Sequence, residues 1–160
     1  MGKHNEQQAE PRIRVIVQNR KARHLYHIEQ TWEAGVVLVG TEVKSLRAGQ
    51  GSLVDSYAEV RGNEVWLNNF HIAPYEKGNR FNVEEKRTRK LLMNRREIRR
   101  LAGLASQPGY TLVPLNVYFK GQRVKVELAL CRGKKEYDKR SAMKDRDARR
   151  EMDRAMSKRY

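Results

Sequence analysis

The amino-acid sequence predicts a mainly β protein with helices, organised as an OB-fold-like closed β-barrel with one long helix and a basic C-terminal tail that is disordered when free. Three observations lead to this prediction. Several short segments have the alternating pattern of strands, residues 86–105 have helical periodicity, and residues 132–160 contain no Val, Ile, Leu, Phe or Trp. A chain of 160 residues with 39% hydrophobic side chains can build one modest core. The expected domains are a flexible N-terminal arm (1–12), the barrel (13–131) and the tail (132–160).

Seven segments are predicted as strands, because their polar and apolar residues alternate or because they are rich in β-branched residues. They comprise residues 13–17, a segment that starts at Tyr26, and residues 36–47, 54–60, 64–72, 110–119 and 124–131. Gly40, inside the third segment, indicates a β-bulge or a tight bend. The short loops at 61–63 and 120–123 are typical of β-hairpins. Short strands joined by tight turns in so small a chain favour a Greek-key barrel of the OB type.

Two segments are predicted as helices. Residues 31–35 are ambiguous, and we expect a short helix that places Trp32 on the core. Residues 86–105 carry apolar side chains, among them Leu91 and Leu101, at helical spacing. The Pro-Gly pair that follows ends this long helix. In the tail, a thin stripe of Ala and Met is too weak to hold a helix alone, so we expect helix formation there only on binding.

The charge balance indicates a polyanionic partner. The chain has 34 Lys and Arg against 19 Asp and Glu, which gives a net charge of +15 and a pI near 10.2. Such an excess of positive charge repels itself in the folded protein, whereas bound phosphate groups compensate it and release counterions. Nucleic acid is therefore favoured over a merely solubilising surface. No apolar stretch approaches the roughly 20 residues of a membrane-spanning helix, so no membrane partner is expected.

The use of cysteine indicates the compartment. Cys131 is the single cysteine, which excludes an internal disulfide framework and Cys-x-x-Cys zinc sites. A lone thiol suits a reducing compartment, and residues 1–14 lack the apolar region of a secretion signal. We therefore expect a cytoplasmic protein.

No arrangement of residues predicts catalysis or a cofactor. Residues 35–40 have the glycine spacing of a phosphate-binding P-loop, but Thr41 and Glu42 stand where that motif needs Lys and then Ser or Thr. The alternating pattern also assigns this block to a strand. His24 and His27 lack further ligands at the spacing of a zinc site, and the Gly-x-Ser-x-Gly nucleophile motif is absent. The sequence therefore predicts no enzyme, no metal and no cofactor.

Two basic segments predict RNA binding. Residues 86–100 contain eight Lys or Arg and one acidic residue. A merely solvated helix face would interleave Glu with Lys, so phosphate contacts are favoured. Residues 19–26 add cations together with His24 and Tyr26, whose rings can stack on unpaired bases. Three further aromatic residues are candidates either for stacking or for the core: Tyr75, Tyr118 and Phe119.

Five motifs carry a resemblance to a known family. They lie at residues 19–24 (Asn-Arg-Lys-Ala-Arg-His), 33–35 (Glu-Ala-Gly), 40–47 (Gly-Thr-Glu-Val-Lys-Ser-Leu-Arg), 87–92 (Arg-Thr-Arg-Lys-Leu-Leu) and 133–140 (Gly-Lys-Lys-Glu-Tyr-Asp-Lys-Arg). In this order they closely resemble the SsrA-binding protein family (SmpB). Five separate motifs over nearly the whole chain make the resemblance highly specific.

The resemblance implies a bacterial cytoplasmic adaptor without catalytic activity. Proteins of this family bind the tRNA-like domain of transfer-messenger RNA and deliver it to stalled ribosomes for trans-translation. When the complex enters the A site, the tail is expected to probe the decoding centre and the empty mRNA channel. Elongation factor Tu and alanyl-tRNA synthetase are implied as indirect partners, through the RNA.

The resemblance also implies roles for individual residues. RNA contacts are implied for six positions on the barrel: Asn19, Lys21, Glu33, Leu92, Asn94 and Lys125. The basic segment adds Arg87, Arg89 and Lys90 as candidate RNA contacts. His24 is implied as the decoding-centre contact. The implied determinants in the tail are Asp138, Lys139, Arg140, Lys144 and Arg146. Whether Glu33 touches RNA or only supports the basic connector stays open.

Two other functions fit the composition. A structural ribosomal protein with a basic extension would stay on the ribosome through high-salt washing, whereas a rescue factor would dissociate and be enriched on stalled ribosomes. A ribonuclease for structured RNA would degrade labelled RNA during long incubation with magnesium.

Overall fold

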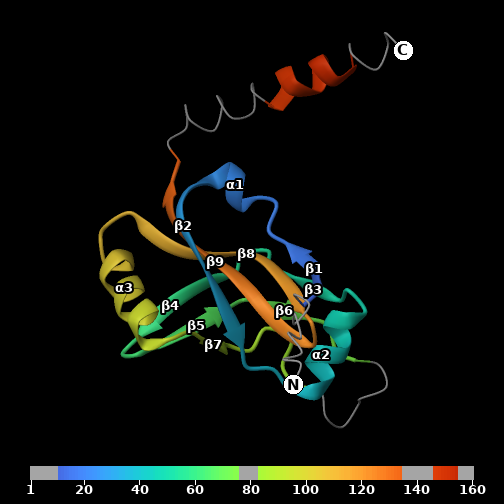
Figure 1. The fold of residues 1–160 in the computed structure, drawn as a ribbon, viewed down its shortest axis with the longest axis vertical. Coiled ribbons are helices and arrows are strands. Elements are labelled where there is room, and N and C mark those ends of the chain that lie inside the picture. The colour runs from blue at the N-terminus through green and yellow to red at the C-terminus, as the bar shows by residue number, and fades with distance from the viewer. Residues whose placement is uncertain (1–10, 76–82, 135–145, 155–160) are drawn as a thin grey trace, which may run out of the picture.

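The computed structural model describes residues 11–75, 83–134 and 146–154, and strands make up most of the described fold (Figure 1). The strands are β1 (Ile13–Gln18), β2 (Tyr26–Val36), β3 (Gly51–Ser52), β4 (Tyr57–Arg61), β5 (Glu64–Asn68), β6 (His71–Ile72), β7 (Arg89–Leu92), β8 (Tyr110–Lys120) and β9 (Arg123–Gly133). The helices are α1 (Ala22–Leu25), α2 (Gly40–Arg47) and α3 (Arg95–Ala105), with a further helix at 146–154. The prediction of a mainly β protein with helices is confirmed.

The main sheet is antiparallel and closes on itself. Its strand order is β1-β8-β4-β5-β7-β2-β9, and β9 also pairs with β8. The six strands from β8 through β9 therefore form a closed circuit of hydrogen-bonded neighbours, which we call the strand ring, with β1 added at the outside of β8. β3 and β6 form a separate two-stranded sheet. Closure leaves few open strand edges, which protects the sheet from pairing with other chains.

The core lies inside the strand ring. Val65, Leu67, Val117, Val126 and Leu128 are all fully buried there. α3 covers one side of the ring (Figure 1), and its buried side chains Ile98 and Leu101 belong to the same core. The helix thus closes the core on one side and presents its remaining, charged face outward.

The predicted hairpins are confirmed. β8 and β9 pair along their whole length, from Tyr110 with Arg132 to Lys120 with Arg123. β4 and β5 form a second hairpin that turns at the predicted loop. β9 continues to Gly133, two residues past the expected end of the barrel at Cys131, because Gly133 pairs with Tyr26.

The predicted short helix at 31–35 is wrong. These residues belong to β2, in which Trp32 pairs with Leu128 of β9. Long-range pairing outweighs the weak local pattern, although Trp32 does pack against the core as expected.

The predicted strand at 36–47 is also wrong beyond Val36, since residues 40–47 form α2. Glu42, Ser45 and Leu46 are buried and lie three and four residues apart, on one helical face. The period-two pattern of apolar residues does not predict this face, because one of the residues that the helix buries is a glutamate. The predicted strand was one of two arguments against a P-loop at residues 35–40, and that argument no longer holds. The other argument holds, because the motif's Lys and Ser or Thr are missing.

The predicted helix at 86–105 is split in two. Its first part contains the strand β7, which fits between β5 and β2, and its second part is α3. Asn94 begins the helix: its Oδ1 accepts a hydrogen bond from the N–H of Glu97 at 3.0 Å. Pairing with two neighbouring strands thus overrides the helical spacing before Asn94.

Candidate nucleic-acid interface

Three of the predicted RNA contacts lie around one end of β2. Gly35 pairs with Leu92 of β7 on one side and with Lys125 of β9 on the other. Directly paired residues point to the same face of a sheet, so Leu92 and Lys125 flank the glycine on one face. Leu92 is 52% exposed, which is unusual for leucine. An apolar side chain and a cation thus stand on either side of a bare stretch of backbone.

Gly35 is required by the close packing of this row. A Cβ at Gly35 would lie 3.2 Å from Cβ of Leu92 and 3.7 Å from its carbonyl oxygen. Any side chain here would have to push Leu92 aside. The glycine therefore sets the position of the exposed leucine.

Glu33 lies two residues before Gly35 and is held by its neighbours. The hydroxyl of Tyr118 donates to its carboxylate, and Lys120 Nζ donates to Oε1 at 3.2 Å. The hydrogen bond from Tyr118, together with Lys120 and the nearby Lys125, holds the pKa of Glu33 below its ordinary value. Glu33 therefore holds the ammonium group of Lys120 beside it while it keeps an exposed, ionised carboxylate.

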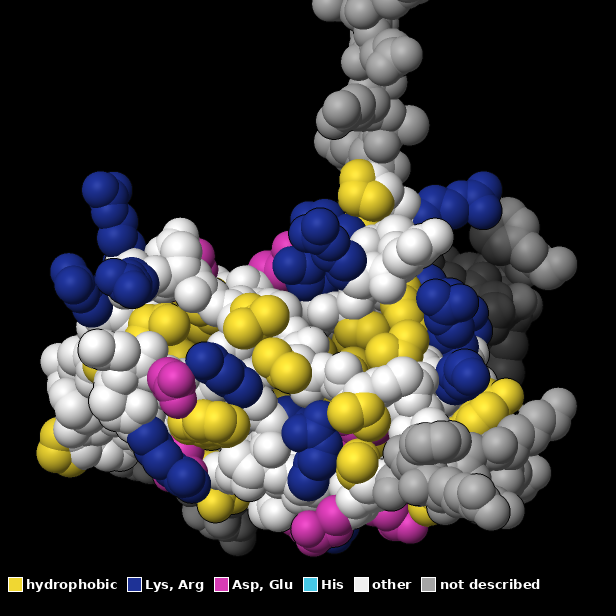
Figure 2. All heavy atoms as spheres, turned by 90° about the horizontal axis from the view of Figure 1, so that it is seen from below, with side chains coloured by type: hydrophobic (Ala, Val, Ile, Leu, Met, Phe, Trp, Pro, Cys, Tyr) yellow, Lys and Arg dark blue, Asp and Glu magenta, His cyan; other side chains and the backbone are white. Residues whose placement is uncertain are grey.

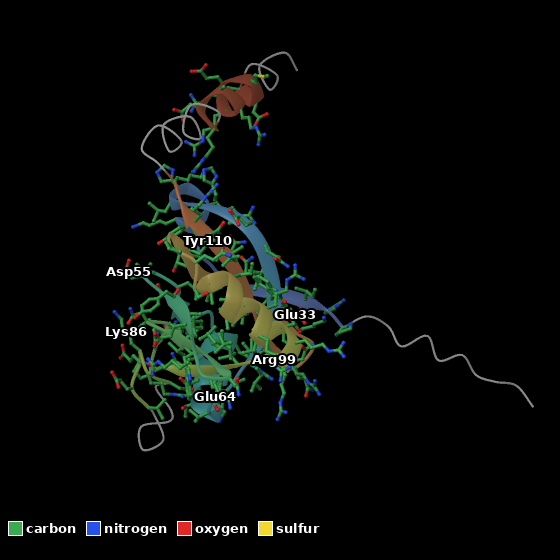
Figure 3. The ribbon with its side chains drawn as sticks, turned by 90° about the vertical axis from the view of Figure 1, so that its left-hand side faces the viewer. Glu33, Asp55, Glu64, Lys86, Arg99 and Tyr110 are labelled. Atoms are coloured by element: carbon green, nitrogen blue, oxygen red, sulfur yellow. The ribbon has the colours of Figure 1, made fainter. Side chains whose placement is uncertain are left out.

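A groove of about 430 Å³ separates β7 from the first turns of α3. Apolar side chains, among them Leu91 and Ile98, line it together with the cations Lys90, Arg95 and Arg99. Glu64 also lines it and pairs with Lys90 at 3.1 Å; Figure 3 shows Glu64 and Arg99 close together at the lower end of α3. Apolar side chains among cations suit an unpaired base and its phosphates.

The surface pattern agrees with this chemistry. Figure 2 shows the face that is turned down in Figure 1, where β2 ends. Hydrophobic side chains gather near its middle, and Lys and Arg side chains lie around and between them. This mixture is typical of a surface that binds unpaired nucleotides rather than of a solvated one.

A second group of predicted residues lies at the other end of β2. Asn19, Lys21 and His24 belong to the connector and α1 that precede Tyr26. The nine residue-to-residue steps from Tyr26 to Gly35 span about 30 Å of strand, so the two groups form separate surfaces. Figure 1 shows α1 at the opposite end of β2 from α2.

The residues of this second surface differ in their exposure and in their contacts. Asn19 Nδ2 donates to the carbonyl of Pro114 at 3.0 Å, which ties the connector to β8. Lys21 is exposed and His24 is half-buried. Arg146, the first residue of the helix at 146–154, has Nη2 3.4 Å from Nδ1 of His24. The structure thus brings one tail residue to the expected decoding-centre contact.

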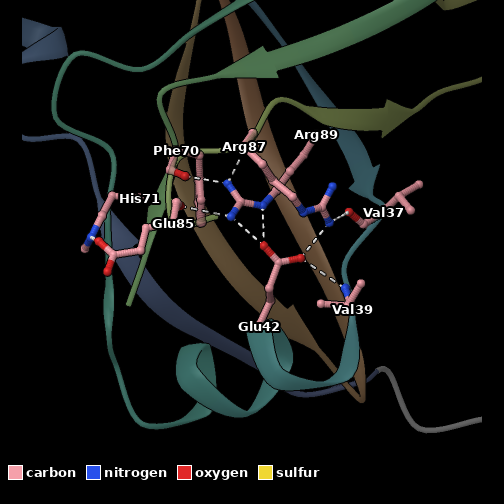
Figure 4. Close-up of polar contacts among 8 residues, drawn as sticks. All are labelled: Val37, Val39, Glu42, Phe70, His71, Glu85, Arg87 and Arg89. Atoms are coloured by element: carbon pink, nitrogen blue, oxygen red, sulfur yellow. Dashed lines mark hydrogen bonds and ion pairs between the residues drawn. The ribbon is translucent and has the colours of Figure 1, made fainter. Parts of the chain in front are cut away.

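Arg89 does not lie where an RNA contact would. The alternation of β7 turns Arg89 and Leu91 inward and Lys90 and Leu92 outward, and Arg89 is fully buried. Its Nε donates to Oε2 of Glu42 at 2.7 Å (Figure 4). The expectation that the cations of this segment point outward is therefore wrong for Arg89, because a strand replaces the predicted helix.

Arg87 shares the same buried carboxylate. Its Nη2 donates to Oε1 of Glu42 at 2.6 Å and to the carbonyl of Val37 at 3.2 Å. Burial raises the pKa of Glu42, but hydrogen bonds from Arg87, from the N–H of Val39 and from Arg89 outweigh it and hold the pKa below its ordinary value. Glu42 is thus an ionised group between two guanidinium groups, and we call the three side chains the Glu42 cluster.

Some predicted residues lie outside the described part of the chain. This applies to residues 1–10 of the expected arm and to the tail determinants Asp138, Lys139, Arg140 and Lys144. The described tail helix at 146–154 has only exposed residues. Of the aromatic candidates, Tyr118 and Phe119 are buried, so they serve the core; Tyr75 lies against Lys44, whose Nζ is 5.5 Å from the ring centre.

Two further groups were missed by reasoning from the sequence. Lys120 was not considered, because its importance comes from its contact with Glu33 across the sheet. Glu42 stands out in the sequence only as a mismatch to the P-loop motif and as one residue of the family motif at 40–47. The spacing of Glu42, Ser45 and Leu46 was the available signal for a buried helical face.

Within residues 11–75, 83–134 and 146–154, no three His, Cys, Asp or Glu side chains are arranged to hold a metal ion. No helix in the same ranges is long and apolar enough to cross a membrane.

Comparison with known proteins places the chain in a family. A model of the SmpB protein family matches residues 16–158. The chain belongs to this family. Curated SsrA-binding proteins are 56% identical over 147 residues in Carboxydothermus hydrogenoformans, with 92% of this chain and 99% of the relative covered, and 57% identical over 147 residues in Pelotomaculum thermopropionicum, with 92% and 96% covered.

A solved structure agrees with this family. It is described as "tmRNA-SmpB: a journey to the center of the bacterial ribosome", is 52% identical and has a TM-score of 0.65. The likeness covers 74% of this chain and 84% of that chain. The SmpB family thus matches in sequence and in fold.

Proposed function

We propose that this chain is a non-catalytic adaptor that binds SsrA RNA, the transfer-messenger RNA, and acts with it on ribosomes in trans-translation. The row formed by Lys125, Gly35 and Leu92 is the observation that carries this proposal. A cation for phosphate beside an exposed apolar side chain suits contact with unpaired nucleotides, and relatives that cover almost the whole chain are named for binding SsrA.

The finer assignment follows the two ends of β2. The surface around Gly35, with Glu33, Asn94 and the groove beside α3, binds the tRNA-like domain of the RNA. The strand ring acts as an OB-type barrel, a fold that binds oligonucleotides on its outer face. Asn19 and Lys21, at the other end of β2, add contacts to the same RNA, and His24 beside them faces the decoding centre when the RNA brings the protein to a stalled ribosome.

The tail adds the ribosomal step. Residues 132–160 carry 12 Lys or Arg and lack large aliphatic side chains, so they gain more from a polyanionic channel than from packing on the strand ring. They probe the empty mRNA channel, with Asp138, Lys139, Arg140, Lys144 and Arg146 as determinants. Elongation factor Tu and alanyl-tRNA synthetase take part through the RNA, in the cytoplasm where ribosomes work.

Sequencing the RNA that copurifies with the full chain at moderate salt tests this function. A single dominant species with a tRNA-like end is expected. Lys125→Gln should weaken binding of that RNA by about ten-fold, as the loss of one phosphate contact and its salt dependence predicts. Lys86→Gln is the comparison within the basic segment 86–100, and it should weaken binding less, because Lys86 is exposed and lies across the molecule from Glu33 (Figure 3). A broad profile of ribosomal RNA would contradict the proposal and favour a structural ribosomal protein.

A further inference from the structure

Glu42 joins four separate parts of the chain from a buried position. Its carboxylate accepts hydrogen bonds from the N–H of Val39 at 3.1 Å, from Arg87 at 2.6 Å and from Arg89 at 2.7 Å. The guanidinium of Arg89 continues inward and donates to the carbonyls of Phe70 and Glu85, the latter at 3.1 Å. One carboxylate therefore connects the start of α2, the start of β7, the segment at 85–87 and Phe70 (Figure 4).

This cluster lies next to the pairing that positions Leu92. β7 is only four residues long, and its pairing with β2 consists of Gly35 with Leu92 and Val36 with Leu91. Beyond this pairing, the N–H of Val37 donates to the carbonyl of Lys90 at 3.0 Å. Arg87, held by Glu42, donates to the carbonyl of the same Val37. The cluster thus clamps β7 to the chain that leaves β2.

We propose that Glu42 is a positioning residue for RNA binding: through Arg87 and Arg89 it holds β7 in register with β2 and so fixes Leu92 beside Gly35. The proposal rests on the function proposed above. Glu42 is 4% exposed and cannot itself touch RNA. It acts on the RNA surface only through the strand that carries Leu92.

A role in stability alone does not account for this arrangement. Buried ion pairs are a weak source of stability, because desolvation of both charges offsets their attraction, and apolar side chains often serve as well. Their directional hydrogen bonds do, however, define one arrangement of the groups they join. β7 has three pairs with β5 and only two with β2, so a further constraint has most effect on the β2 side, where a shift by one residue would turn Leu92 inward.

The test uses the full chain, two variants of the cluster and one control. Glu42→Gln keeps the size of the side chain and removes its charge, and Arg89→Lys keeps the charge but loses the branched donor geometry. Leu112→Ala is the control: Leu112 is buried in β8, paired with Ala58 and Leu130, and β4 and β5 lie between its strand and β7 in the sheet. Each variant is compared at a temperature at which circular dichroism shows that it is folded.

Both cluster variants should lower affinity for full-length SsrA RNA by about ten-fold, the size of one lost contact, and should shift the NMR signals of the Leu92 methyl groups and the Gly35 amide. Leu112→Ala should bind SsrA RNA with an affinity within two-fold of that of the original chain, even where its melting temperature falls as far as those of the cluster variants. Unchanged affinity in folded Glu42→Gln, or an equal loss in Leu112→Ala, would overturn the proposal.

The same measurements separate this inference from the function on which it rests. If the original chain does not bind SsrA RNA, the proposed function fails, and the NMR signals still report whether Glu42 positions Leu92. If the original chain binds and the Leu92 signals of Glu42→Gln do not move, the positioning role alone fails.

Discussion

Gly35 and Leu92 show how a single missing side chain can prepare a binding surface. Leucine side chains are most often buried. Leu92 is nevertheless held outward, beside a residue that has no side chain of its own. Glu33 has a complementary effect, because its contacts with Tyr118 and Lys120 of β8 fix its carboxylate and the Lys120 ammonium beside the same stretch of β2. Local contacts of this kind reduce the ordering cost of binding.

Gly35→Ala should therefore reduce both stability and RNA affinity. The added Cβ would stand 3.2 Å from Cβ of Leu92, and such overpacking typically costs about 1–3 kcal/mol. Affinity for SsrA RNA should fall several-fold because Leu92 must move. Urea unfolding and filter binding measure the two effects.

Gly103→Ala is the matched control for that change. Gly103 lies in α3, and a Cβ there would meet nothing within 4 Å. Alanine in an exposed helix should raise the free energy of unfolding by up to about 1 kcal/mol and leave RNA affinity unchanged. If both alanine variants behaved alike, close packing at Gly35 would not be the cause.

The junction of β7 and α3 places an exposed leucine and begins a helix within three residues. Leu92 ends the strand, and Asn94 begins the helix two residues later by accepting from the N–H of Glu97. The short link between them brings the cations of α3 to the side of the groove. A strand directly followed by a capped helix therefore arranges apolar and charged groups around one cavity.

Variants of Asn94 separate capping from RNA contact. Asn94→Ala should lower the free energy of unfolding by about 1 kcal/mol, the usual cost of a lost cap. Asn94→Asp keeps an oxygen that can cap, and its charge suits a helix N-terminus, so stability should hold while the carboxylate repels phosphate and weakens RNA binding. Thermal unfolding and RNA affinity, measured on both variants, distinguish the roles. Full RNA affinity in Asn94→Asp would exclude Asn94 from the interface.

The whole chain combines a closed strand ring with a basic extension, and the junction between them is set by β9. Arg132 and Gly133 still pair with His27 and Tyr26, and the N–H of Lys134 donates to the carbonyl of Leu25 at 3.0 Å. The backbone contacts that attach the end of β9 to the strand ring thus extend to Lys134. The excess of positive charge of the whole chain suits a polyanionic partner. The two surfaces at opposite ends of β2 suit two such partners.

Truncation after Lys134 should separate RNA binding from the ribosomal step. The shortened chain should keep its melting temperature and bind SsrA RNA within about three-fold at physiological salt, where distant charges are screened. It should lose peptide tagging of proteins on stalled ribosomes. Truncation after Cys131 should in addition lower the melting temperature, because it removes the last pairs of β2 with β9. A collapse of RNA affinity after the first truncation would contradict the assignment of the RNA to the strand ring.

Much of this protein followed from local sequence patterns. The hairpin of β8 and β9 was predictable because each strand alternates and a short turn joins them. The charge excess indicated nucleic acid, and the motifs at 19–24, 33–35 and 87–92 indicated the family and marked segments of both surfaces. These features depend on neighbouring residues or on composition, which the sequence displays directly.

Other features arise from contacts between distant segments. Residues 40–47 alternate like a strand, but burying the charge of Glu42 against Arg87 and Arg89, more than forty residues away, requires a helix that turns it inward. Residues 89–92 have helical spacing, yet they pair as a strand because β5 and β2 leave an open place between them. Arg89 is buried and Leu92 exposed for the same reason: the period of a strand, fixed by its two neighbours, decides which side chains face the core.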